Sequence, residues 1–193
     1  MSMVPLDWLL DLLERSRLLT ADQRREIDIK GTQQRARVLR DAQQRMGEAL
    51  AASSYVVSAP ELVASFEFLD AQERPIDEER IAQVIAQETG VRYHKVDPLQ
   101  LDMALVTRTI SRPFALRHVV LPLSMNDGVM RVALENPFDR ELVENLARIT
   151  LCSLDPVLAT KADILKAIVE IYGFRKSVES ASKERDTQGS MDF

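Results

Sequence analysis

Residues 112–137 read R-P-F-A-L-R-H-V-V-L-P-L-S-M-N-D-G-V-M-R-V-A-L-E-N-P, and the centre of this stretch predicts a β-hairpin. Two apolar runs, 119–125 and 129–134, flank the turn sequence Asn-Asp-Gly at 126–128. Asp-Gly accepts the positive φ angles that tight hairpin turns require. Strand alternation predicts one buried face, made by Met130, Val132 and Leu134 of the second run and by Val119, Leu121 and Leu123 of the first.

Prolines in and after the hairpin predict where its first strand lies and where the next helix begins. Pro122 has no amide N–H, so we expect the first strand to lie at an edge of its sheet. Asn136-Pro137 predicts the start of a helix, with Asn as N-cap and Pro in the first turn. This helix is expected to bury Leu142, Leu146 and Ile149.

The totals of the chain exclude several classes of protein. Its 193 residues are 46% apolar and 28% charged, so we expect one folded domain and a small second one rather than a disordered chain. A net charge of −5 argues against general nucleic-acid binding. The lone cysteine, Cys152, predicts a small buried hydrophobe in a reducing compartment.

We predict a cytoplasmic protein with no direct membrane insertion. No apolar run approaches the roughly 18 residues that a membrane span needs. Asp7 and Asp11 stand where a signal peptide carries positive charge. The protein is therefore expected to reach the inner membrane only through contact with another protein.

The first half of the chain predicts helices only. Leucines at helical spacing predict a helix over 5–15, and the capping box Thr20-Ala-Asp-Gln23 starts a second one. This second helix is expected to break near Gly31 and to resume to about residue 51. A third helix is predicted over 60–69. Residues 16–23 and 54–61 resemble each other, which indicates a helix-turn-helix unit used twice.

The second half predicts a small sheet with helices. Asp77 caps a helix that ends at Gly90, residues 93–96 and 152–158 read as strands, and Thr160 caps the last helix. Short helices are expected from Asp97 to about Val106 and around 113–116. The fold class is α+β: a helical N-terminal subdomain, then a β-α-β-β-α-β-α module with a mostly antiparallel sheet. The predicted domains are 1–74, 75–174 and a polar linker or disordered tail over 175–193, with the first boundary at Gln72-Glu-Arg-Pro75.

Motifs for catalysis are absent from the sequence. The chain contains no Walker-type phosphate loop, no G-x-G-x-x-G, no H-E-x-x-H and no C-x-x-C. His94 and His118 are expected to be structural, and nothing near Cys152 predicts an activated thiolate. We therefore predict an interaction or sensory module that is not an enzyme, with no metal and no cofactor, and we expect no ATP hydrolysis by residues 1–193.

Ordered blocks in the second half resemble a known family. They are V-R-Y-H-K-V-D-P-L-Q-L-D at 91–102, S-R-P-F-A at 111–115, V-V-L-P-L at 119–123, D-G-V-M-R-V-A-L-E-N-P at 127–137, P-V-L-A-T-K-A-D-I at 156–164 and I-Y-G at 171–173. Over about 76–174 the chain resembles the N-terminal domain of the type II secretion and type IV pilus assembly ATPases (the GspE/PilB group). The resemblance implies a non-catalytic adaptor that docks the motor onto the cytoplasmic domain of an inner-membrane platform protein. It also implies the ATPase core, in the same polypeptide or complex, as a partner.

The first half resembles, less closely, the MshE-type helical module, whose paired motifs bind cyclic di-GMP. Arg45-Met-Gly47-Glu-Ala-Leu50 matches the motif opening Arg-Leu-Gly, with Met for Leu, and Tyr55 follows in the place of the motif's aromatic residue. The resemblance implies ligand contacts by Arg45, Gly47, Leu50 and Tyr55. An arginine pairs with phosphate, and a glycine lets backbone N–H groups approach it. In the earlier copy, 7–9 reads Asp-Trp-Leu, so one of the two openings is lost.

Two functions therefore follow from the sequence: a docking adaptor, and a cyclic di-GMP sensor that controls the same machinery. For docking, the stretch 108–117 combines Arg108, Arg112 and Arg117 with Phe114. Arginine and aromatic residues are favoured at interface centres. The alternative is that Phe114 is simply core and the arginines are solvated.

Overall fold

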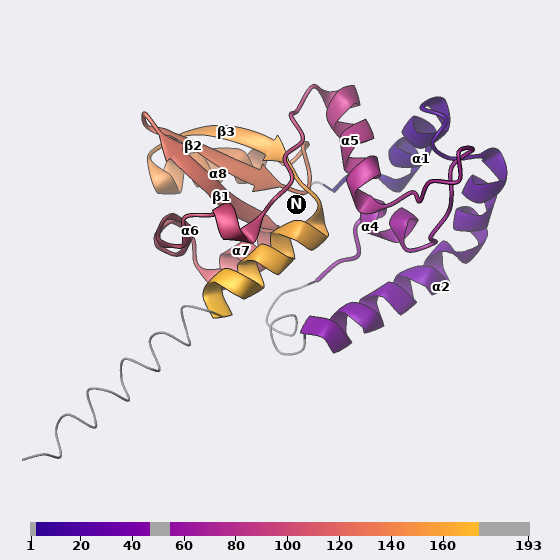
Figure 1. Ribbon diagram of the computed structural model, residues 1–193, viewed down its shortest axis with the longest axis horizontal. Helices are drawn as coiled ribbons and strands as arrows, with labels where there is room; N and C mark the ends of the chain where they lie inside the picture. Colours follow the sequence, from indigo (N-terminus) through magenta and orange to yellow (C-terminus); the bar gives the residue numbers. More distant parts are fainter. Residues whose placement is uncertain (1–2, 47–54, 174–193) are drawn as a thin grey trace, which may run out of the picture.

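The computed structural model describes residues 3–46 and 55–173 (Figure 1). A group of helices from the first half of the chain packs beside a three-stranded sheet and its helices from the second half. This confirms the α+β class and the order of helices first and sheet second. The predicted tail at 175–193, and Gly47 and Leu50 of the predicted ligand motif, lie outside the described residues.

Two helices at the start of the chain follow the predicted pattern, with one exception. Helix α1 (Leu6–Arg15) buries its leucines, and α2 (Ala21–Met46) begins after the predicted capping box. Thr20 Oγ1 accepts the Gln23 N–H at 3.2 Å, and Gln23 Oε1 accepts the Thr20 N–H at 2.9 Å. The predicted break near Gly31 is wrong, because α2 runs through it. A glycine inside a helix costs only about 1 kcal/mol, and packing of α2 against α4 offsets it.

Helix α4 (Ala59–Ala64) repeats the capping box of α2. Ser58 accepts the Glu61 N–H, and Glu61 accepts the Ser58 N–H. These two residues stand at the same places in the 54–61 segment as Thr20 and Gln23 do in 16–23, so the predicted repeat is present as two equivalent helix starts. The predicted extension of α4 to residue 69 is wrong, since the helix ends at Ala64 and Glu67 takes a positive φ of 55°.

Helix α5 (Glu78–Thr89) is capped by Asp77 and ends at Gly90, whose φ is 71°, as predicted. Its buried face, made by Ile81 and Ile85, joins the same core cluster as the leucines of α1 and the apolar residues of α4. The predicted division at residues 74/75 stays a prediction, and this packing raises a competing division after α5.

The α/β part consists of short helices, three strands and a final helix. In chain order these are η1 (Pro98–Gln100), α6 (Met103–Thr109), α7 (Arg112–His118), β1 (Val120–Asn126), β2 (Val129–Leu134), α8 (Arg140–Thr150), β3 (Ser153–Leu158) and a helix over 161–173. The strand order is β1-β2-β3, with β1 and β2 antiparallel and β2 and β3 parallel. The sheet is therefore mixed. Both α6 and α7 contact β1, whereas α8 contacts β3.

The hairpin confirms the central prediction. Asp127 and Gly128 take φ angles of 49° and 76°, which are the positive values expected for the turn. Met130, Val132 and Leu134 are buried. Pro122 lies in β1, an edge strand, and a register shift follows it at Ser124.

Two other elements and two residues differ from expectation. The strand predicted over 93–96 is reduced to one bridge between Tyr93 and Leu158. The helix after the hairpin begins at Arg140, because Asp139 and not Asn136 caps it. On that helix Ile149 is 64% exposed, so it is not core. Cys152 is only half-buried rather than buried.

The two halves are packed on each other through ring and aliphatic contacts. Trp8 of α1 lies edge-on to Phe138, with 5.1 Å between ring centroids. Leu158, at the end of β3, belongs to the core cluster of α1, α4 and α5, and its register partner in β2, Leu134, belongs to the core cluster of the sheet. In the described part of the chain, no helix is long and apolar enough to cross a membrane.

Candidate functional site

A cleft of about 500 Å³ lies between α2, the start of α5 and the last helix. We call it the α2 cleft. Its walls combine aliphatic side chains of α2 and the last helix with charged and aromatic groups, which are Arg45, Tyr55, Glu61, Glu78, Lys161, Lys166 and Glu170. This size is in the range of small-molecule sites.

The structure brings together the two described residues of the predicted ligand motif. Arg45 is exposed in the last turn of α2, and Tyr55 is half-buried just before α4. Both line the α2 cleft, although the segment between them is not described. An exposed guanidinium at the rim of a cleft is suited to an anionic group.

Three residues at the floor of the cleft were not singled out from the sequence: Glu61, Glu78 and Lys161. The Lys161 ammonium lies 2.9 Å from Glu61 Oε2, donates to the carbonyl oxygen of Val56 at 2.7 Å, and stands 3.6 Å from the centroid of the Tyr55 ring. Glu61 also accepts the hydroxyl of Tyr55. The sequence offered Glu61 and Lys161 only as helix-start residues, and their separation of 100 residues concealed the pairing.

The floor carries more carboxylates than cations. Glu78 Oε2 accepts the Ala162 N–H at 3.3 Å. Burial, together with the nearby carboxylates of Glu61 and Glu135, raises the pKa of Glu78 to about 7. Burial likewise raises the pKa of Glu135, which is hydrogen bonded to Ser58. At neutral pH the floor therefore holds one carboxyl group, that of Glu78, close to its titration point, beside one buried lysine.

The predicted docking residues differ in their burial and surroundings. Arg108 and Arg112 are exposed and have no ion pair among the residues that the structure describes. Phe114 is half-buried and packs against the core, and its ring lies tilted against that of His118 with 4.4 Å between ring centroids. Arg117 lines a smaller cleft with Tyr55 and Val56.

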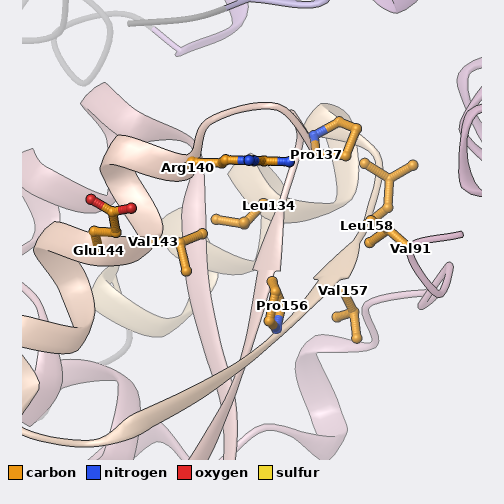
Figure 2. Close-up of a pocket in the computed structure, with 9 residues that line it drawn as sticks. All are labelled: Val91, Leu134, Pro137, Arg140, Val143, Glu144, Pro156, Val157 and Leu158. Atoms are coloured by element: carbon orange, nitrogen blue, oxygen red, sulfur yellow. The ribbon is translucent and has the colours of Figure 1, made fainter. Parts of the chain in front are cut away.

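Figure 2 shows another, mostly apolar cleft of about 230 Å³ beside the ends of β2 and β3. Arg140 and Glu144 of α8 lie at one side of this cleft. The apolar side chains that converge there are those of Val91, Leu134, Val143, Pro156, Val157 and Leu158. It contains none of the described residues predicted for ligand or partner. Its lining offers packing surface and two charges, without an acid–base pair set for catalysis.

The histidines and acids give no metal site. In residues 3–46 and 55–173 no group of three or more His, Cys, Asp or Glu could hold a metal ion. Burial lowers the pKa of His94 and of His118. The backbone N–H of His94 donates to Leu158 at 2.8 Å, where the chain runs beside β3.

Comparisons with known proteins agree with the resemblance seen in the sequence. Residues 89–178 match the family model of the MshEN domain. Over 122 residues the chain is 29% identical to the type IV pilus assembly ATPase TfpB of Acinetobacter baylyi. That match covers 60% of this chain and 21% of the relative, so it spans about a fifth of the relative's length.

A solved structure shares the fold at low sequence identity. A structure of MshE with cdg matches with a TM-score of 0.50 and 17% identity, covering 85% of this chain and 98% of that one. The match to the N-terminal domain of XpsE covers 87% of this chain and 97% of the XpsE domain, with 17% identity and a TM-score of 0.41. The first match shows the fold alone. Residues 89–178 of this chain thus match the MshEN domain family, and the chain is homologous to part of a type IV pilus assembly ATPase.

Proposed function

We propose that this chain is a non-catalytic adaptor and regulatory domain of a type II secretion or type IV pilus assembly ATPase. It docks the motor to the cytoplasmic domain of an inner-membrane platform protein. The observation that carries the proposal is the match of residues 89–178 to the MshEN domain family, together with the homology to TfpB. The sequence has no phosphate loop, so ATP hydrolysis belongs to an ATPase core outside these residues.

Docking through α6 and α7 is supported by two exposed arginines, Arg108 and Arg112, that form no ion pair in the described part of the chain. Between Asp102 and Asp127 the sequence has no acidic residue, although the chain as a whole carries a net charge of −5. Several other arginines of the described part are held by carboxylates, as Arg24 is by Asp11 and Glu14. Exposed arginines without such partners are available for an acidic surface on another protein.

The docking surface is tested by charge reversal. The double variant Arg108→Glu/Arg112→Glu should retain less of the platform domain in a pull-down, with folding checked by circular dichroism. Arg148→Glu is the matched control, because Arg148 is an exposed arginine on α8, which packs beside β3 rather than β1. Retention unchanged by the double variant would remove this surface, and equal loss with the control would indicate a nonspecific charge effect.

A second candidate function, sensing cyclic di-GMP, is favoured by the meeting of Arg45 and Tyr55 in the α2 cleft. Arg45 would pair with a phosphate, while the aliphatic walls from α2 and the last helix would contact the rest of the ligand. The solved relative MshE carries cdg, which supports the choice of ligand. The acidic floor opposes tight binding of an anion, so the expected affinity is weak.

Calorimetry decides this second function. Loss of a charge-assisted hydrogen bond is worth about 1.5–3 kcal/mol, which is roughly tenfold to a hundredfold in affinity. Arg45→Ala should therefore abolish a micromolar signal. Arg40→Ala, also exposed on α2 but not part of the cleft, should leave it intact. Tight binding that survives Arg45→Ala would show that the ligand is held elsewhere.

A further inference from the structure

Lys161 is a buried cation at the N-terminus of a helix, a position that disfavours positive charge. It is the first residue of the last helix, where the unpaired backbone N–H groups make the local field positive. Its side chain is only 3% exposed. An ammonium group taken out of water at a helix start is stable only if other groups compensate its charge.

The direct contacts of the ammonium come from one distant segment, residues 55–61, while Glu78 and Glu135 add electrostatic attraction. Glu61 supplies the carboxylate, Val56 the backbone carbonyl and Tyr55 the ring face. Glu61 is itself fixed, because it accepts the N–H of Ser58 and the hydroxyl of Tyr55. The ammonium of Lys161 thus connects residues 55–61, which lead into α4, to the last helix.

The same contacts make the floor of the α2 cleft. Tyr55, Glu61 and Lys161 line the cleft, and in Figure 1 the chain before α4 runs between α2 and the last helix. The buried face of the last helix packs in the core of the sheet. Any movement of 55–61 away from Lys161 would therefore open the cleft floor and loosen the first half of the chain from the second.

We infer that Lys161 and Glu61 form a latch that holds segment 55–61 against the last helix and closes the floor of the α2 cleft. Through this latch, binding of a ligand in the α2 cleft would affect how the two halves of the chain pack against each other. It rests on the contacts described above and not on the identity of a ligand. It can therefore fail or hold independently of the docking and cyclic di-GMP proposals.

Hydrogen exchange of the intact chain, followed by mass spectrometry, tests the latch. Lys161→Met removes the ammonium but keeps an unbranched apolar stem, and it leaves Glu61 without its cation. The amides of 55–61 should then exchange at least tenfold faster, while those of β1 and β2 keep their protection. Lys166→Met is the control, since Lys166 lies exposed on the same helix, and it should change nothing in 55–61.

A second variant keeps the test decisive if Lys161→Met does not fold. Glu61→Gln retains the size and an acceptor oxygen but removes the charge, and it should also accelerate exchange in 55–61. Unchanged exchange of 55–61 in both folded variants would overturn the latch. An equal acceleration throughout the sheet would overturn it as well, because the pair would then act on global stability alone.

Discussion

At the scale of single residues, Asp70 is a buried carboxylate with both arginine and backbone N–H partners. Its side chain is 1% exposed and pairs with Arg74 and Arg80. It also accepts the backbone N–H groups of Gln72 and Arg74, at 2.8 Å and 2.9 Å. Burial by itself raises the pKa of Asp70, but these hydrogen bonds outweigh it and hold the pKa well below its usual range.

Asp70→Asn should lower the urea midpoint of unfolding at pH 7, because it removes the charge that the two arginines surround. Since the pKa of the folded state is depressed, this contribution is present above the ordinary pKa of an aspartate and is lost as the pH falls through the folded value. Asp22→Asn, at an exposed ion pair with Arg25, is the control and should have little effect. Equal midpoints for the two variants would contradict this account of Asp70.

The pKa of Glu78 is shifted in the opposite direction from that of Asp70. Its pKa is raised to about 7 by burial and by neighbouring carboxylates. The folded state therefore prefers the protonated form, and stability should fall as the pH rises from about 4.5 to about 7. Glu78→Gln mimics that form and keeps an acceptor for the Ala162 N–H. Its Tm should exceed that of the wild type at pH 8 and approach it at pH 4.5.

Glu170→Gln controls this pH experiment, since Glu170 is exposed at the same cleft. It should leave the pH dependence of Tm unchanged. A Glu78→Gln variant with the same Tm difference from wild type at both pH values would show that Glu78 does not titrate near neutrality.

Residue-level prediction from sequence succeeds where the partner is local. The Asp-Gly turn, the capping residues Thr20, Ser58 and Asp77, and the αL glycine Gly90 all depend on neighbours within four residues. The Lys161–Glu61 pair was missed because neither residue type nor spacing marks a contact made across 100 residues. Arg45 and Tyr55 are predicted through family resemblance and stay predictions, whereas Glu78 is not among the predicted site residues.

At the scale of elements, two glycines show when the missing side chain matters. Gly128 holds the hairpin turn with a φ of 76°, so Gly128→Ala should destabilise the chain by about 1–2 kcal/mol. Gly31 is inside α2, where an added Cβ would meet only the Ile27 Cγ2 at 4.0 Å. Gly31→Ala should therefore stabilise it by about 0.5–1 kcal/mol. Chemical denaturation measures both, and changes of the same sign in the two variants would contradict this distinction.

Elements were predicted well by periodicity and poorly at their ends. The alternation of β2 and the leucine stripe of α1 gave the correct buried faces. The start of α8 was misplaced because Asn136 and Asp139 are both good caps, and Asn136 instead accepts the Phe138 N–H in a local turn. The strand at 93–96 failed because it pairs with β3 only at Leu158.

The two outer strands each carry a proline, Pro122 in β1 and Pro156 in β3. A proline cannot donate to a further strand, so both edges resist the addition of another chain. The sheet edges are thus less suited to partner docking than the helices are. This favours a docking surface made by side chains of α6 and α7.

At the scale of the whole molecule, the packing of α5 decides how the halves behave. Residues 71–75 are exposed, and the domain prediction places a boundary there. The apolar face of α5, however, is covered by α1 and α4. Limited proteolysis near 71–75 should therefore nick the chain without separating it, and both pieces should co-elute in size-exclusion chromatography. Separate elution of a folded piece from residue 76 would favour the 74/75 division.

Binding of this chain to a platform protein at the inner membrane is the main proposal. The most direct test is calorimetric titration of the intact chain with the cytoplasmic domain of the platform protein from the same organism. We expect saturable binding that weakens about tenfold or more in Arg108→Glu/Arg112→Glu and is retained in Arg148→Glu. No binding of the wild-type chain at concentrations where the platform domain is folded would contradict the claim.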